Sequence, residues 1–193
     1  MQPPEGGSSV KKRLAMLACF VVLVLFGACA QASVKATLTA RMATRSGPGT
    51  QYTEMGTYFS KGKKVTAVSR YYDSRNNVWW IQVEFKYRNA YRRAYTGRKR
   101  MNVISNKLPE EKLICTASIT ERVVPRYGPG ETFESHTRSI AEGTTGKVYQ
   151  EEDGWTQFEY KSSAGKMRRV WVPNEYIEAI SYAEEEVIQG GDD

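Results

Sequence analysis

The 193-residue chain contains one histidine and three cysteines, and this scarcity excludes several kinds of chemistry. Cys19 and Cys29 lie within or at the edge of an apolar N-terminal run, so Cys115 is the only cysteine in the rest of the chain. A single cysteine allows no intrachain disulfide. Cys115 with His136 is the sole combination available for nucleophilic catalysis or for a Cys/His metal site. Nothing around either residue recommends that role, so we expect no catalytic residue, metal or cofactor, and we expect Cys115 to be buried.

Beyond the N-terminal run, the sequence also lacks the apolar spacing of amphipathic helices. Short segments instead alternate apolar and polar residues and are separated by glycine, proline, asparagine and aspartate. The segments expected to form strands are residues 36–42, 63–68, 79–85, 91–96 and 102–104 in the first half, and 116–123, 146–150, 155–160 and 167–173 in the second. Many short strands divided by turns predict an all-β fold of small barrels or sandwiches.

The N-terminal segment has the order of features typical of a secretory signal peptide. Basic residues 11–13 precede an apolar run at 14–30, which is shorter than the roughly 20 residues that a membrane span needs. An Ala-x-Ala site predicts cleavage after Ala32, and a second such site places it after Ala30. An uncleaved anchor and lipid attachment at Cys29 remain open as alternatives. We therefore expect a bacterial protein that is secreted or held in the cell envelope, touching a membrane only through its leader or a lipid.

One turn occurs twice. Residues 45–49 read Arg-Ser-Gly-Pro-Gly with Tyr52 three positions later, and residues 126–130 read Arg-Tyr-Gly-Pro-Gly with Phe133 three positions later. Proline fixes its own φ and the following glycine can take a positive φ, so each copy predicts a sharp reversal. The downstream segments also align, 80–86 with 155–161 and 92–95 with 168–171. This repeat predicts two related modules at 33–104 and 114–181, a polar linker at 105–113 and an acidic tail at 182–193.

The net charge of +7 is distributed unevenly. Residues 33–109 contain 16 Lys and Arg against 3 Asp and Glu, whereas residues 110–193 contain 9 against 17. Opposite charges predict either that the modules dock on each other or that the basic module binds an anionic envelope polymer, through Arg98, Lys99 and Arg100. Interleaved aromatic and basic residues would also suit nucleic acid, but an exported protein meets little of it.

Each half resembles a bacterial SH3-type (SH3b) domain. The resemblance rests on a strand, the Arg-x-Gly-Pro turn with its aromatic residue, a glycine-preceded strand, a tryptophan-led strand and a last strand that carries Arg-x-Trp. In the first half Tyr95 replaces that last tryptophan. The resemblance covers residues 36–104 and 115–180. It implies two tandem, partly open five-stranded barrels that bind short peptides or cell-wall components and are rarely catalytic.

Alternation along the strands predicts binding surfaces. Ile81, Val83 and Phe85 share one face, which we assign to the core, so that Trp80 faces outward. The same reasoning directs outward the residues that we expect to line solvent-facing ligand grooves: Tyr52, Trp80, Arg93 and Tyr95 in the first module, and Phe133, Trp155, Arg169 and Trp171 in the second. Large aromatic rings on a polar face are typical of binding sites. The alternative is that a β-bulge buries these rings or that they cover the open end of a barrel.

The sequence thus predicts an exported, non-catalytic binding protein for a cell-envelope ligand, with a peptidoglycan stem peptide as the first expectation. Docking on an exported partner, such as a cell-wall hydrolase, and binding of an anionic envelope polymer are the alternatives.

Overall fold

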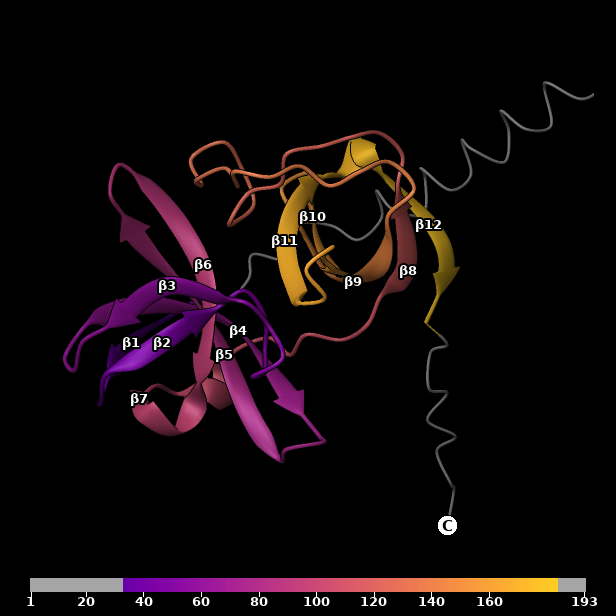
Figure 1. The fold of residues 1–193 in the computed structure, drawn as a ribbon. Coiled ribbons are helices and arrows are strands. Elements are labelled where there is room, and N and C mark those ends of the chain that lie inside the picture. Colours follow the sequence, from indigo (N-terminus) through magenta and orange to yellow (C-terminus); the bar gives the residue numbers. More distant parts are fainter. Residues whose placement is uncertain (1–32, 184–193) are drawn as a thin grey trace, which may run out of the picture. The chain divides into compact units, whose positions relative to one another are not determined.

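The computed structural model describes residues 33–183, which form two antiparallel β-sheets (Figure 1). These residues contain no α-helix, only the short 3₁₀ helices η1 (Arg98–Arg100), η2 (Ser105–Lys107) and η3 (Asn174–Tyr176). The predicted all-β fold is confirmed. The predicted signal peptide with its cleavage sites, Cys29, and residues 184–193 of the predicted tail lie outside the described residues.

The first sheet has seven strands in the order β3-β2-β6-β5-β4-β1-β7. Their bounds are β1 Val34–Leu38, β2 Met42–Arg45, β3 Glu54–Phe59, β4 Lys64–Asp73, β5 Val78–Tyr87, β6 Ala90–Gly97 and β7 Met101–Asn102. Ile81, Val83 and Phe85 of β5 lie in its apolar core, as the alternation predicted. Phe85 meets Phe59 edge-on, with ring centroids 4.7 Å apart.

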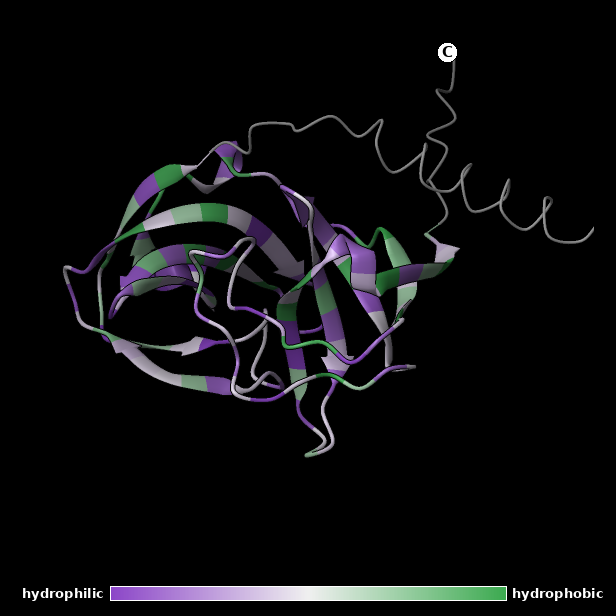
Figure 2. Ribbon diagram, turned by 90° about the horizontal axis from the view of Figure 1, so that it is seen from above, coloured by the Kyte–Doolittle hydropathy of each residue, from purple (hydrophilic) through white to green (hydrophobic). Residues whose placement is uncertain are grey.

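The second sheet has five strands in the order β11-β10-β9-β8-β12 and curls around its own apolar cluster (Figure 1). Their bounds are β8 Cys115–Ile119, β9 Thr145–Glu152, β10 Trp155–Lys161, β11 Met167–Pro173 and β12 Ile177–Tyr182. Phe158, Val170 and Val172 are fully buried there. Cys115 belongs to the same cluster, as expected, and burial raises the pKa of its thiol to about 11. Figure 2 shows apolar and polar residues alternating along the strands.

Two strands, β3 and β12, were missed, and two segments were predicted too long, 36–42 and 116–123, the latter because β8 ends at Ile119. Residues 36–42 are divided into β1 and β2 because the chain leaves the sheet at 39–41. β3 was not predicted from the sequence, and it contains Gly56, which adopts a φ of 67° within the strand. β12 pairs only with β8, at the edge of the second sheet, and is half-exposed, so its sequence carries little alternation.

Both Gly-Pro turns form as predicted, with positive φ at Gly49 (155°) and Gly130 (119°). A second reason for the repeat lies in the preceding glycines. A Cβ atom on Gly128 would overlap the ring of Phe133, and one on Gly47 would overlap the ring of Tyr52. The aromatic residue three positions after each turn therefore lies directly against the turn's first glycine, which explains the spacing.

Backbone hydrogen bonds join the two halves of the chain in matched pairs, each between a strand of one half and the Gly-Pro turn loop of the other. The members of each pair are residues that align in the repeat, with donor and acceptor sheets exchanged. They are Thr53 N to Met167 O (3.1 Å) with Glu134 N to Tyr91 O (3.0 Å), and Arg169 N to Ser46 O (3.1 Å) with Arg93 N to Tyr127 O (2.7 Å). Each half thus presents to the other the same backbone N–H donors and C=O acceptors, at aligned positions, that the other presents to it.

Candidate functional site

The side chains predicted to face outward do point away from both apolar clusters, but most of them meet one another instead of solvent. Six of the eight candidate ligand-binding residues are buried, with exposed fractions between 2% and 9%: Tyr52, Arg93, Tyr95, Phe133, Arg169 and Trp171. Trp80 and Trp155 are half-buried. The expectation that these residues form solvent-facing grooves is therefore wrong for the six. Alternation identified the correct face of each strand, but the other sheet covers it.

Arg169 of β11 is at the centre of this buried layer. Its Nη1 lies 2.6 Å from Glu111 Oε2 and its Nε lies 2.6 Å from Glu159 Oε2. The guanidinium also stacks 3.6 Å from the ring centroid of Tyr149. Burial raises the pKa of Glu111 and outweighs the opposing effect of Arg169. Arg169 is thus engaged on two edges by carboxylates and on one face by an aromatic ring.

Tyr95 ties together groups from both sheets. Its hydroxyl lies 2.8 Å from Glu111 Oε2 and donates to that carboxylate, and it accepts from Gln82 Nε2 (3.1 Å) and Gln157 Nε2 (3.0 Å). The two glutamines align in the repeat, so one hydroxyl serves both copies of the same position. Burial and the Glu111 charge raise the pKa of Tyr95 well above its usual value. Its hydroxyl is therefore a protonated, fully used structural group.

Arg93 occupies the position in β6 that aligns with Arg169. Burial alone would lower its pKa, but two carboxylates raise it. Glu152 binds the guanidinium with two hydrogen bonds of 2.6 and 2.8 Å, and Glu84 accepts from Nε at 3.1 Å. The charge also lies 5.5 Å from the ring centroid of Phe133. Both arginines predicted to contact a ligand are instead held by carboxylates of the protein.

The three basic residues assigned to anionic polymer divide into two groups. Arg98 donates to Ser105 Oγ and to two backbone carbonyls, so it closes the turn after β6. Lys99 and Arg100 are exposed. Binding of an anionic polymer by this segment stays a prediction, now confined to two side chains.

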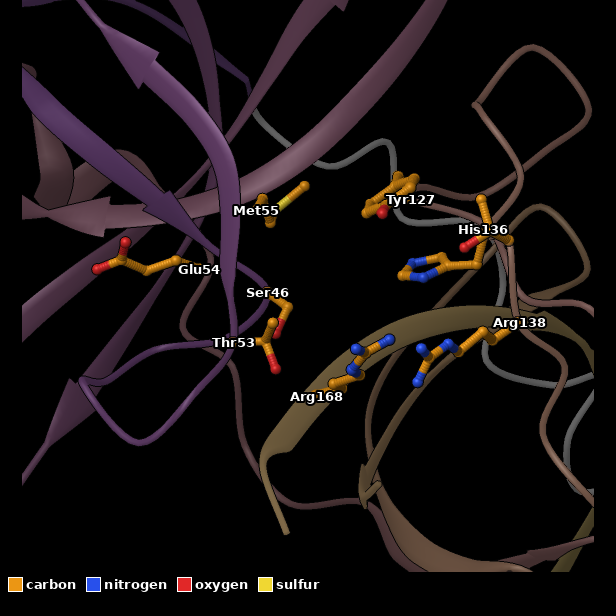
Figure 3. A pocket seen from close by; sticks show the side chains of 9 residues that line it. Ser46, Thr53, Glu54, Met55, Tyr127, His136, Arg138 and Arg168 are labelled. Atoms are coloured by element: carbon orange, nitrogen blue, oxygen red, sulfur yellow. The ribbon is translucent and has the colours of Figure 1, made fainter. Parts of the chain in front are cut away.

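An open pocket of about 320 Å³ lies between β3 with its preceding loop and, in the second half, β11 with the segment 127–138 (Figure 3). Its lining comes from three separate segments of the chain. The lining residues are Ser46, Thr53, Glu54, Met55, Tyr127, His136, Thr137, Arg138 and Arg168. None of them was among the predicted site residues, because no local pattern links positions so far apart in the sequence.

The pocket has buried polar atoms that lack a hydrogen-bond partner. These atoms are Ser46 Oγ, His136 Nε2 and Arg168 Nε. An unpaired buried polar atom costs about 1–3 kcal/mol, so native structures rarely keep one without a use. Three such atoms around one hollow mark it as the candidate functional site.

His136 is neutral in this setting. Burial, together with the charges of Arg168 and Arg92, lowers its pKa to about 3. Its ring stacks on Tyr127 with centroids 3.7 Å apart and an interplanar angle of 19°. The imidazole is therefore held in place as a hydrogen-bonding group without charge. The only hint in the sequence was that the chain contains no other histidine.

The charge directed into the pocket is positive. Arg168 and Arg138 extend along one side of it (Figure 3). Glu54 lines the wall, but its carboxylate points away and pairs with Arg45, with Nη2 and Oε1 2.7 Å apart. Such a lining suits an anionic group.

Within residues 33–183, no group of three or more His, Cys, Asp or Glu side chains could hold a metal ion. No helix in that part of the chain is long and apolar enough to cross a membrane. No family model, curated protein or solved structure matches the chain. The SH3b resemblance therefore depends on the residues quoted for it.

Proposed function

We propose that this chain is an exported, non-catalytic protein whose two SH3b-type modules dock on each other and together bind a peptide of the cell envelope. The first candidate is a peptidoglycan stem peptide. The matched backbone hydrogen bonds between the sheets support the duplication, because aligned residues make equivalent contacts in opposite directions. Because the contact between the sheets buries most of the predicted aromatic residues, we assign the binding site to the pocket instead.

The observation that carries the proposal is the set of unpartnered buried atoms around the pocket. Ser46 Oγ, His136 Nε2 and Arg168 Nε have no hydrogen-bond partner within residues 33–183. Met55 and Tyr127 add apolar wall next to them. Small-ligand sites commonly combine a few convergent polar groups with apolar surface. The lining carries no thiol and directs no carboxylate inward, so its side chains suit binding.

A sedimentation assay with purified cell-wall sacculi tests the proposal. Arg168→Gln should reduce retention at least tenfold, because it removes the less exposed of the two arginine charges that line the pocket. Lys166→Gln is the matched control, since it removes one positive charge two residues away from an exposed side chain outside the pocket. The proposal is supported if the wild type and K166Q are retained on sacculi and R168Q is not. Equal retention of all three, or none by the wild type, contradicts it; thermal melts check that each variant is folded.

A second candidate function is binding of an anionic envelope polymer, favoured by the exposed Lys99 and Arg100 in the basic first half. Long-chain polyphosphate is a suitable probe. The affinity for polyphosphate should fall steeply between about 50 and 200 mM salt, because binding to a polyanion releases its condensed counterions. It should also fall in the double variant Lys99→Gln, Arg100→Gln. Salt-independent binding would exclude this candidate.

A further inference from the structure

We infer that the pocket holds the terminal carboxylate of a short peptide against Arg168 and Arg138, with the His136 imidazole and the Ser46 hydroxyl as additional hydrogen-bonding partners. The identity of the peptide as a wall component rests on the proposed function. The inference that the bound group of this peptide is negatively charged depends only on the residues that line the pocket.

Two observations indicate that the bound group is negatively charged. First, the guanidinium groups of Arg168 and Arg138 are the charges directed at the hollow, while the Glu54 carboxylate is turned away (Figure 3). Second, Arg168 Nε and Ser46 Oγ are buried without partners, so they can donate to an incoming oxygen at no cost in existing bonds. Planar guanidinium donors match the two oxygens of a carboxylate in geometry as well as in charge.

Size and wall chemistry favour a peptide end over a phosphate polymer. A volume of about 320 Å³ is at the small end of the range for ligand pockets. Met55 and Tyr127 line it together with the arginines, so a small apolar side chain can lie next to the bound carboxylate. A polyanion needs a continuing cationic track, whereas the cations directed at this hollow are the two guanidinium groups of Arg168 and Arg138.

His136 provides a reporter for this binding because it is the only histidine in the sequence. Its two carbon-bound ring protons give one pair of histidine NMR signals, which need no assignment by mutation. A carboxylate bound next to the imidazole would stabilise the protonated ring and raise the pKa of His136 from about 3. The signal should therefore move on binding, and its acid titration should shift to higher pH.

The experiment titrates the protein with D-alanyl-D-alanine, with the same dipeptide amidated at its C-terminus, and with inorganic phosphate. We expect the free dipeptide to move the His136 signal saturably and to raise its pKa, and the amide to bind at least tenfold more weakly. Arg168→Gln should abolish the response, while Lys166→Gln should keep it.

Equal binding of the amide, or no response of His136 to the free dipeptide, would overturn the inference. Tighter binding of phosphate than of the dipeptide would overturn it in favour of a phosphate group. The sacculus assay separates this result from the proposed function. Dipeptide binding without retention on sacculi would leave the carboxylate pocket in place and remove its role at the cell wall. Retention on sacculi without a His136 response would leave the role at the cell wall in place and remove the carboxylate pocket.

Discussion

Glu111 and Arg169 form an ion pair that is sealed from solvent, with Nη1 and Oε2 2.6 Å apart and side chains 0% and 1% exposed. Glu111 belongs to the segment that connects the two sheets, and its backbone N donates to Arg70 O at 2.8 Å, which holds that segment along β4. Leu108, three residues earlier, lies in the core of the first sheet. Residues predicted to be a polar linker are therefore part of the packed interior.

The first prediction concerns this pair. Glu111→Gln should destabilise the protein by about 1–3 kcal/mol in urea unfolding, because the buried Arg169 guanidinium loses one of its two carboxylate partners and keeps only Glu159. The neighbouring Glu110→Gln is the control, since Glu110 forms a solvent-exposed pair with Arg70, whose contribution should be about 0–1 kcal/mol. Equal effects at positions 110 and 111 would contradict the buried role.

The second prediction concerns the turn glycines. Gly128→Ala should cost about 1–3 kcal/mol in unfolding free energy, because the new Cβ overlaps the ring of Phe133 and the side chain must move within a packed layer. Gly97→Ala is the control, since its Cβ would meet only Met42 Cε at an ordinary 3.7 Å. If Gly128→Ala is as mild as Gly97→Ala, Phe133 does not hold the position described here.

The third prediction concerns acid stability. His136 has a folded pKa of about 3, below its unfolded value of 6.5. The unfolded state therefore binds more protons between these pH values, and the contribution of His136 to stability is complete above pH 6.5 and is lost as the pH falls towards 3. Between pH 7 and pH 4 the loss should be about 3 kcal/mol. The unfolding free energy of His136→Gln, measured in urea, should lack this part of the pH dependence. The prediction is refuted if the variant and the wild type lose the same stability between pH 7 and pH 4.

The fourth prediction concerns the buried thiol. Burial and the Glu151 charge raise the pKa of Cys115 from 9 to about 11. Its contribution to stability is therefore complete below pH 9 and is lost as the pH rises from 9 to 11. A thiol reagent at pH 8 should label Cys115 slowly in the folded protein and quickly in urea. Cys115→Ala should remove this part of the alkaline destabilisation, and rapid labelling of the native protein would contradict the burial.

Local chemistry was enough to predict the fold class, most strands and the inward faces. Ile81, Val83, Phe158 and Val170 could be assigned to a core because alternation depends only on neighbours in the chain. The Gly-Pro turns could be predicted for the same reason. β3 could not, since a strand that contains Gly56 with a positive φ has no local signal that distinguishes it from a loop.

The candidate site could not be predicted because it depends on how distant segments meet. Alternation shows that Tyr95 and Trp171 leave their own cores, but it cannot show what covers them. The only feature of the sequence that singled out Arg169 was its alignment with Arg93 in the repeat. Ser46, His136 and Arg168 come from three segments without common spacing, and only the three-dimensional arrangement brings them to one pocket.

The matched hydrogen bonds between the sheets make the contact surface self-complementary, as in a twofold dimer whose subunits have been joined end to end. The connecting segment then acts as a tether that keeps the effective concentration of one half around the other high. Because the pocket takes its walls from both halves, it exists only while they are paired. Any molecule that fills it must also tighten their association, so occupancy by ligand and cohesion of the halves are one linked equilibrium.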